Sequence, residues 1–336
     1  MKSFAFYVNI LCIVFVAIVI ARFVFSDEGK YKHFLVNSFN YVFPEFAAGS
    51  VGLAISQALR MASILQWGVR MWAEMENFMT SVERALEYGE VKQEPKKGQI
   101  LDNWPKKGEI QFSNVSLSYN ESDDYVLKEV NFTARSKEKI GVIGRTGAGK
   151  SSIISTLFRL YETEGSITID GINTKSLALN YLRRHISIIP QDPVLFRGTI
   201  RDNIDPERLY TDSQIWKAIK AANLTNCVPS LEYEVSKNGS NFSVGQRQLI
   251  CLARAVVRDN KIVILDEVTA NVDDETDALI NETIKRQFEH CTIVVVTHKL
   301  HSVINLDKIV VMSQGKIVDF DSPSNLLKRK NGYFYN

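Results

Sequence analysis

The chain of 336 residues has few cysteines and almost no net charge. Its four cysteines are far apart and form no Cys-x-x-Cys pair, which indicates neither a disulfide framework nor a zinc site and favours a reducing compartment. The 40 basic and 38 acidic residues are well mixed and leave a net charge of +2. Nothing in that balance suggests a nucleic-acid partner. The sequence also has no internal repeat and no low-complexity tract.

What stands out first is an apolar run from Phe4 to Phe25, interrupted only by Asn9 and Arg22. As a helix this run would be roughly 33 Å long, enough to cross a hydrocarbon core of about 30 Å. A secretory signal peptide is the alternative, because Lys2 gives a basic start. The run is too long for a typical signal sequence, and no small-x-small cleavage site follows it. We therefore expect a retained membrane-spanning helix.

A second candidate span covers Ala47–Val69 and is less apolar, because Gln57, Arg60 and Gln66 interrupt it. Small residues in its first half are typical of packed membrane helices, yet its hydropathy equally fits a soluble amphipathic helix. Apolar residues continue at helical spacing, so we expect one helix over about 47–90. These predictions assign residues 1–90 to a membrane domain and the Pro-, Gly- and Lys-rich segment 91–108 to a linker. From 109 to 336, strand-like and helical runs alternate, which predicts an α/β domain with a largely parallel sheet.

A glycine-rich loop joins an apolar strand at 139–143 to a helix. Backbone N–H groups at Gly147 and Gly149, with the positive end of the helix, are suited to phosphate oxygens. Lys150 is predicted to reach the β- and γ-phosphates, and the Ser151 hydroxyl to bind Mg²⁺. The predicted cofactor-binding residues are Gly144, Arg145, Thr146, Gly147, Ala148, Gly149, Lys150, Ser151 and Ser152.

Three further strand-like runs end in polar residues. The run 262–265 leads into Asp266, the expected Mg²⁺ partner, and Glu267, placed to polarise an attacking water. Gln191 follows the run 186–190 and is a predicted γ-phosphate sensor and Mg²⁺ ligand. His298 follows the run 293–297 and is a second predicted sensor, although a histidine at a strand end is more often structural.

Two more features complete the predicted site. Tyr119, at the end of a strand that begins at Ile110, offers an aromatic face on which adenine could stack, but an ordinary strand tyrosine would look the same. Ser243 and Gln246 fit the capping-box pattern at the start of an apolar-faced helix. That cap could also hold a γ-phosphate presented by another domain, with Val244 and Gly245 between the two capping residues.

These residues resemble those of the ATP-binding cassette transporters, and in particular the C-terminal end of a multidrug-resistance-associated exporter. The motifs that carry the resemblance are GRTGAGKSS at 144–152, PQDPVLFRGTIRDNIDP at 190–206, NFSVGQRQLICLARA at 241–255, ILDEVTANVD at 264–273 and THKL at 297–300. The resemblance implies a P-loop NTPase cassette with a mixed sheet core and a helical signature subdomain, preceded by the last two transmembrane helices. It also implies that Asp273 lies in the loop that links two ATP sites.

In functional terms, the resemblance implies ATP and Mg²⁺ as cofactors and ATP hydrolysis that drives efflux of amphipathic organic anions or xenobiotics. The implied partners are a second nucleotide-binding domain, further transmembrane helices and the lipid bilayer. The resemblance also implies a multi-pass protein of the plasma membrane whose cassette lies in the cytosol. With only two candidate helices, the chain is expected to be a fragment or truncated form.

Three other functions remain open at this point. An ATP-gated channel or channel regulator of the same branch would carry the same motifs. A truncated product could be inert, and a cassette ATPase acting on DNA or ribosomes is disfavoured by the Phe4–Phe25 run. The sequence departs from the family pattern at 231–240, which is short and has Lys237 where glutamate is usual. It also has Val244 at the middle glycine of the signature.

Overall fold

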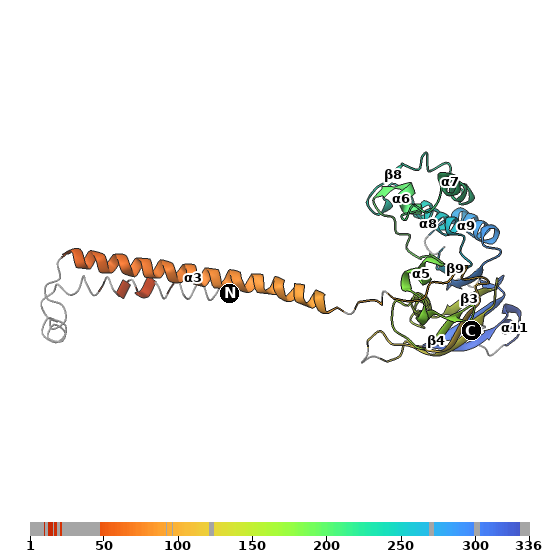
Figure 1. Ribbon diagram of the computed structural model, residues 1–336, viewed down its shortest axis with the longest axis horizontal. Helices are drawn as coiled ribbons and strands as arrows, with labels where there is room; N and C mark the ends of the chain where they lie inside the picture. Colours follow the sequence, from red (N-terminus) through yellow and green to blue (C-terminus); the bar gives the residue numbers. More distant parts are fainter. Residues whose placement is uncertain are drawn as a thin grey trace. The chain divides into compact units, whose positions relative to one another are not determined.

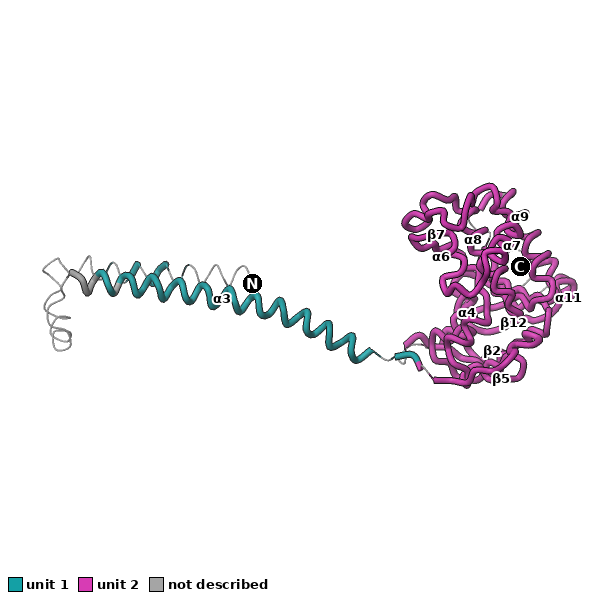
Figure 2. Tube along the Cα trace, turned by 45° about the horizontal axis from the view of Figure 1, so that its top comes forward, with its two compact units in different colours: residues 1–94 teal, residues 95–336 magenta. Residues whose placement is uncertain are grey.

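The computed structural model describes residues 10, 13–15, 17–18, 21, 48–91, 93–95, 97–120, 124–268, 272–298 and 303–329. The chain divides into two compact units, Met1–Glu94 and Pro95–Asn336 (Figure 2), and each is described by itself. Most of the predicted spanning segment Phe4–Phe25 lies outside the described residues.

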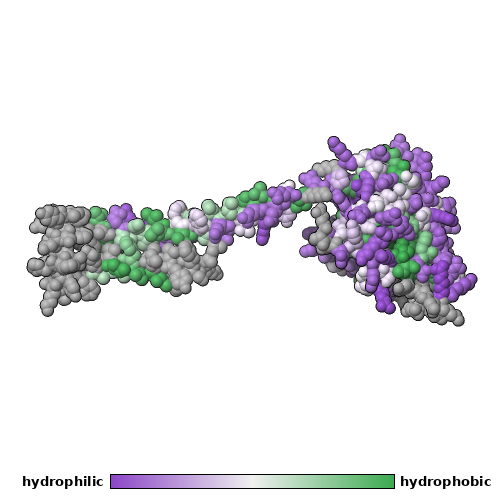
Figure 3. All heavy atoms as spheres, turned by 90° about the horizontal axis from the view of Figure 1, so that it is seen from below, coloured by the Kyte–Doolittle hydropathy of each residue, from purple (hydrophilic) through white to green (hydrophobic). Residues whose placement is uncertain are grey.

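Unit 1 contains the long helix α3 (Ala48–Glu90). Hydroxyl groups along it bond back to its own carbonyls, Ser63 Oγ to Leu59 O for example, which lets polar residues sit within the helix. Many of its large apolar side chains are exposed, and Figure 3 shows apolar surface along it. Among the described residues no helix combines the length and apolar character needed to cross a membrane. The spanning helix predicted at Ala47–Val69 is therefore not confirmed.

Unit 2 alternates strands and helices along the chain (Figure 1). Its strands are β1 (Ile110–Leu117), β2 (Leu127–Ala134), β3 (Lys139–Gly144), β4 (Glu164–Ile169), β5 (Ile172–Asn173), β6 (Ile186–Ile189), β7 (Gly198–Thr199), β8 (Glu234–Val235), β9 (Ile262–Asp266), β10 (Thr292–Val296), β11 (Lys308–Ser313) and β12 (Lys316–Asp321). Its helices are α4 (Lys150–Leu157), α5 (Leu179–Arg184), α6 (Ile200–Ile204), α7 (Asp212–Ala221), α8 (Val244–Arg258), α9 (Asp274–Gln287) and α11 (Pro323–Lys328), with 3-10 turns η1 (Thr174–Ser176) and η2 (Lys237–Gly239).

The main sheet has the strand order β12-β11-β3-β10-β9-β6. Its strands from β11 to β6 run parallel, and β12 pairs antiparallel with β11. A second, antiparallel sheet has the order β2-β1-β4-β5. The prediction of an α/β domain with a mixed sheet is confirmed. The apolar runs that predicted buried strands are buried as expected, since Ile262, Val263 and Ile264 are at most 1% exposed.

Two large hydrophobic cores stabilise unit 2. One lies between the antiparallel sheet, α4 and the main sheet, with Phe112, Ile140 and Leu157 among its members. The other joins the helices α6, α7, α8 and α9 to β6 and β9, and includes Ile219 and Leu252. In Figure 1 these helices gather at the end of unit 2 away from β4. The segments that carry the predicted site residues thus rest on two hydrophobic cores that share the main sheet.

The second half of the expected linker is ordered against unit 2. Trp104 is only 6% exposed, and its indole N–H donates to the carbonyl of Ile169 at 3.2 Å. The Asp170 carboxylate accepts backbone N–H groups from Lys106 to Glu109 at 2.7–3.2 Å. The buried Trp104 side chain and the Asp170 carboxylate therefore fix a segment whose composition predicted a flexible linker.

Candidate nucleotide-binding site

The predicted catalytic and phosphate-binding residues lie at one edge of the main sheet. β3, β10, β9 and β6 are parallel neighbours, and their carboxyl ends lead respectively into the glycine-rich loop, His298, Glu267 and Gln191. Carboxyl ends of parallel strands share one edge, where α/β proteins bind their ligands. The topology thus brings together residues that are separated by more than a hundred positions in the sequence.

The loop at 144–152 has the backbone conformation that glycine permits. Gly147 and Gly149 have φ of 81° and 99°, a region that side-chain-bearing residues rarely adopt. A Cβ at Gly149 would come within 2.9 Å of Leu127 Cδ2, so glycine is also required there for space. Lys150 Nζ donates to the carbonyls of Gly144 and Arg145 at 3.0 and 3.3 Å. The ammonium group therefore lies over the loop that would surround the phosphates.

The remaining loop residues divide by exposure. Arg145, Thr146 and Ser151 are exposed, whereas Ala148 and Ser152 are buried. The Ser151 hydroxyl is thus on the open side of the loop, where a metal-bound phosphate could reach it, and Ser152 faces the protein interior.

Glu267 lies between the two predicted sensors. Its Oε2 accepts from Gln191 Nε2 at 3.1 Å, and its Oε1 is 3.2 Å from His298 Nδ1. Its backbone has a left-handed φ of 44° and its N–H donates to Val296 O at 2.8 Å. This unusual conformation turns the carboxylate out of the strand direction, while the hydrogen bond ties it to β10. The three predicted catalytic residues are therefore in direct contact.

Asp266 is half-buried at the end of β9. Burial raises the pKa of its carboxyl above the ordinary value and the negative Glu267 raises it further, whereas the positive Lys150 acts in the opposite direction. These causes place Asp266 within electrostatic reach of both residues. A cation would offset the cost of keeping two adjacent carboxylates ionised there.

Tyr119 lies just beyond β1 and is 40% exposed. Its hydroxyl is 2.9 Å from Ser152 Oγ, which connects it to the first turn of α4. Its ring meets that of Tyr161 edge to face, with centroids 4.7 Å apart. The sequence did not single out Tyr161, although an exposed aromatic residue directly after the phosphate-loop helix was a possible signal.

The predicted signature residues form a complete capping box at the start of α8. Gln246 N–H donates to Ser243 Oγ at 3.2 Å, and Ser243 N–H donates to Gln246 Oε1 at 3.0 Å. Gln246 Nε2 also donates to Cys227 Sγ at 3.3 Å, a contact that the sequence did not suggest. Val244 is 37% exposed at this helix terminus. The side chains and backbone N–H groups of Ser243 and Gln246 thus cap each other, and Cys227 holds the Gln246 amide from outside the helix.

Gly245 and Asp273 meet through Thr276 on α9. Asp273 caps α9 by accepting the Thr276 N–H at 3.0 Å, and its carboxylate also accepts the Thr276 hydroxyl at 2.9 Å. A Cβ at Gly245 would lie 2.9 Å from Thr276 Cγ2. The close approach of the two helix starts therefore needs glycine at 245. In the described part of the chain, no hydrogen bond joins Ser243–Gln246 to the 144–152 loop.

Arg254 is a second residue that sequence reasoning missed. From α8 it donates to the carbonyls of Asn203 and Val194 and to Asn203 Oδ1, at 2.5, 2.9 and 3.1 Å. It thereby ties the helix that starts at the signature to the segment that follows Gln191. No local pattern reveals this role, because the acceptors lie some fifty to sixty residues earlier.

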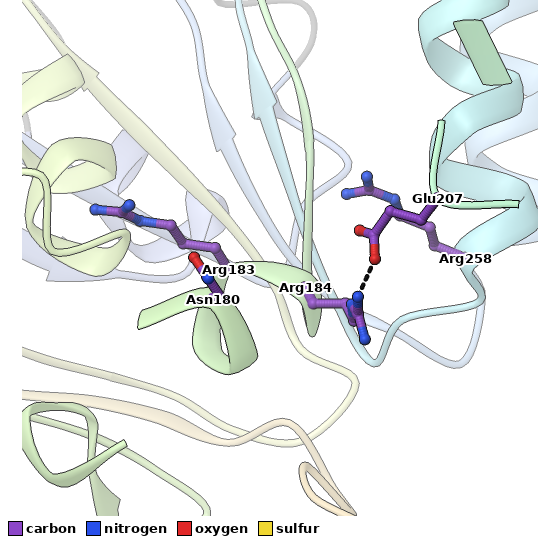
Figure 4. Close-up of a pocket in the computed structure, with 5 residues that line it drawn as sticks. All are labelled: Asn180, Arg183, Arg184, Glu207 and Arg258. Atoms are coloured by element: carbon purple, nitrogen blue, oxygen red, sulfur yellow. Dashed lines mark hydrogen bonds and ion pairs between the residues drawn. The ribbon is translucent and has the colours of Figure 1, made fainter. Parts of the chain in front are cut away.

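A polar cleft of about 380 Å³ lies apart from these residues. It is lined by Asn180, Arg183, Arg184, Glu207 and Arg258 (Figure 4). Arg184 and Glu207 form an ion pair between α5 and the segment after α6. The Arg183 guanidinium is directed away from that pair, toward the carbonyls of Phe158 and Arg159. The cleft contains none of the predicted site residues.

Known proteins resemble this chain over most of its length. Residues 127–270 match the ABC transporter family. A probable multidrug resistance-associated protein of Drosophila melanogaster is 42% identical over 98% of the chain and 24% of its own length. Human ATP-binding cassette sub-family C member 4 is 47% identical over 86% of the chain and 22% of its own length, and mouse sub-family C member 2 is 47% identical over 85% and 19%.

The chain spans about a quarter or less of the length of these curated relatives. The match includes β3, the glycine-rich loop, the capped start of α8 and the Asp266–Glu267 strand end. The similarity over this region agrees with the geometry at the sheet edge. This chain therefore carries an ABC transporter ATPase domain, homologous to that of the multidrug resistance-associated exporters.

Proposed function

We propose that this chain is the ATP-binding and ATP-hydrolysing module of an ABC-type exporter. The observation that carries the proposal is the position of Glu267, held between Gln191 and His298 at the end of β9, which is separated from the phosphate-loop strand β3 by β10 alone. A carboxylate fixed in this way can orient a water molecule and accept its proton as the water attacks the γ-phosphorus. Gln191 and His298 would then respond to the presence of the γ-phosphate.

The other residues would bind the nucleotide rather than react. Backbone N–H groups of Gly147–Gly149 would surround the phosphates, Lys150 would contact the β- and γ-phosphates, and Tyr119 would stack on adenine. Loop residues Gly144, Arg145, Thr146, Ala148, Ser151 and Ser152 complete this proposed site.

The residues present fit magnesium. Ser151, Asp266 and Gln191 offer hydroxyl, carboxylate and amide oxygens, which suit an ion that is held by one or two carboxylates together with substrate phosphates. Among the described residues there is no group of three or more His, Cys, Asp or Glu side chains that could hold a metal by itself. Bound Mg²⁺ would supply charge neutralisation of the phosphates, and these three residues would orient it.

The signature residues Ser243–Gln246 are proposed to serve the nucleotide of a second nucleotide-binding domain. The exposed start of α8 has N–H groups and a Ser243 hydroxyl available for a γ-phosphate, and within the described part of the chain they make no hydrogen bond to the 144–152 loop. Asp273, next to Gly245 through Thr276, would connect the two sites. Catalysis would then require two domains face to face.

The transport part of the proposal rests on the relatives and on the N-terminal sequence. One relative is named a probable multidrug resistance-associated protein, and this likeness supports a role in efflux of amphipathic organic anions or xenobiotics. The Phe4–Phe25 run is proposed to span a bilayer, in the plasma membrane, with further transmembrane helices as partners and unit 2 in the cytosol.

The catalytic assignment is tested with Glu267→Gln in the full chain. We expect phosphate release from MgATP to fall about 10²- to 10⁴-fold, because the substituted amide cannot accept a proton. ATP binding should persist, and the ATP-bound variant should accumulate as a dimer in size-exclusion chromatography. Exposed Glu289→Gln, on the segment after α9, is the matched control and should behave as wild type. Equal hydrolysis rates for wild type and Glu267→Gln would refute the assignment.

A further inference from the structure

Tyr161 and Tyr119 form an aromatic corner beside the phosphate loop. Their ring planes meet at 78°, with centroids 4.7 Å apart, which is an arrangement that aromatic pairs prefer. The two residues are 44% and 40% exposed, so apolar ring surface remains open to solvent at the corner. An exposed pair of this kind, next to a loop built for phosphates, is a surface on which a flat base can pack.

The turn that carries Tyr161 is fixed by its backbone. α4 ends in a Schellman motif, in which Leu160 N–H donates to Ser155 O and Arg159 N–H donates to Thr156 O, both at 3.0 Å. Arg159 has the left-handed φ of 50° that this motif requires. The backbone immediately before Tyr161 is therefore fixed by the hydrogen bonds of this helix end.

Two arginine side chains, one from outside the turn and one from within it, tie the same turn to its surroundings. Arg183 donates to the carbonyls of Phe158 and Arg159 at 3.0 and 3.1 Å. Arg159 in turn donates to the carbonyls of Thr174 and Leu177 at 2.8 and 2.9 Å. These bonds to charged donors make the platform under Tyr161 stiff, and a stiff aromatic surface loses little entropy when a ligand packs on it.

Tyr119 contacts the other end of the same helix. Its hydroxyl forms a hydrogen bond with Ser152, which is 5% exposed and lies in the first turn of α4. Both rings are thus positioned by α4, whose N-terminus would face the phosphates. The hydroxyl bond restrains one end of the Tyr119 ring, and contact with Tyr161 restrains its side. Without Tyr161 the ring could swing about its side-chain torsions.

We propose that Tyr161 is a positioning residue for the nucleotide base: it holds the Tyr119 ring and completes the aromatic corner that receives adenine. The inference rests on the proposed function, since the phosphate loop must bind the triphosphate at the same time. On this proposal, the aromatic corner contributes the share of the binding free energy that makes the chain bind ATP more tightly than an inorganic polyphosphate.

The test compares MgATP with magnesium tripolyphosphate, which has the phosphates but no base, by isothermal titration calorimetry on the full chain. Tyr161→Ala should weaken ATP binding about 2- to 12-fold, the range expected for one aromatic pair, and leave tripolyphosphate binding unchanged. Tyr161→Phe keeps the ring and should bind ATP as wild type does. Leu160→Ala, on the 53%-exposed neighbour, is the matched control and should have no effect.

The outcomes separate this inference from the function on which it rests. If Tyr161→Ala weakens both ligands equally, or neither, or if Tyr161→Phe is as weak as Tyr161→Ala, the positioning role is wrong. If wild type binds neither ligand, or Lys150→Ala binds tripolyphosphate as well as wild type does, the proposed phosphate site itself is wrong. Circular dichroism melting of each variant shows that the fold is retained.

Discussion

Arg254 offers the sharpest test of how α8 is held against the rest of unit 2. Its guanidinium donates three hydrogen bonds to oxygen atoms, two to Asn203 and one to the Val194 carbonyl, and a longer one to Cys251 Sγ within α8, and burial lowers its pKa. Asn203 is only 2% exposed, and its side chain also accepts the Phe196 N–H at 2.9 Å. Arg254→Ala would remove this donor from the carbonyl and amide oxygens of the buried Asn203 and from the carbonyl of the exposed Val194.

The expected cost follows from the number and type of bonds. Hydrogen bonds to a charged group contribute about 1.5–3 kcal/mol each, but bonds from one guanidinium are not additive. We therefore expect Arg254→Ala to lower the free energy of unfolding by about 3–5 kcal/mol. Arg258→Ala is the matched control: Arg258 is on the same helix and lines the open cleft, and its side chain makes no hydrogen bond within the described part of the chain. Its replacement should cost less than about 1 kcal/mol.

Urea unfolding followed by tryptophan fluorescence measures both values. Trp67 and Trp72 are on α3 and are replaced by phenylalanine, so that the signal comes from Trp104 and Trp216 in unit 2. Trp216 packs against the core that contains α8 and should report the loss first. If Arg254→Ala and Arg258→Ala shift the transition equally, the three bonds do not hold α8 and the reasoning fails.

Two other substitutions test weaker or more pH-dependent contacts. Burial raises the pKa of Asp170, but its bonds from four backbone N–H groups outweigh this and leave the pKa below the ordinary 3.8. The ionised carboxylate therefore stabilises the fold above pH 3.8, and this stabilisation is lost as the pH falls through the lowered pKa. Asp170→Asn should lower the free energy of unfolding in urea by roughly 1–3 kcal/mol at pH 7 and by almost nothing at acid pH. A difference that is independent of pH would contradict this sign. Arg184→Ala breaks an ion pair with Glu207 whose side chains are 54% and 43% exposed, so thermal unfolding should show a decrease of less than about 1 kcal/mol in the free energy of unfolding. A larger decrease would contradict the small contribution expected of a solvent-exposed ion pair.

The positions of the candidate site residues were most predictable where a strand ends. Asp266, Glu267, Gln191 and His298 each follow an apolar run, and parallel strands necessarily bring their carboxyl ends to one edge. The glycines at 147 and 149 were also recognisable from the sequence, because glycine can adopt the positive φ that the loop has there without steric cost. Local patterns of this kind do not depend on distant partners.

Residues whose roles depend on distant partners were missed. Trp104 is buried against Ile169, and Asp170 fixes the adjoining backbone, so a segment with the composition of a linker is ordered by a turn more than sixty positions away. Tyr161 meets a ring at position 119, and Arg254 meets carbonyls at 194 and 203. None of these pairs has a spacing that a single sequence can reveal. Periodicity predicts which face of an element is buried but not what lies opposite that face.

The cap at Ser243 shows why a structural role and a functional one need not compete. In the capping box, Ser243 uses its oxygen as an acceptor and its backbone N–H as a donor, so the hydroxyl proton can still be donated to a phosphate oxygen. Glu267 is comparable, since each of its oxygens has one protein partner and about two lone-pair sites. A water can therefore bind the carboxylate without displacing Gln191 or His298. Both groups are held in place through one set of atoms and lone pairs and can act through another.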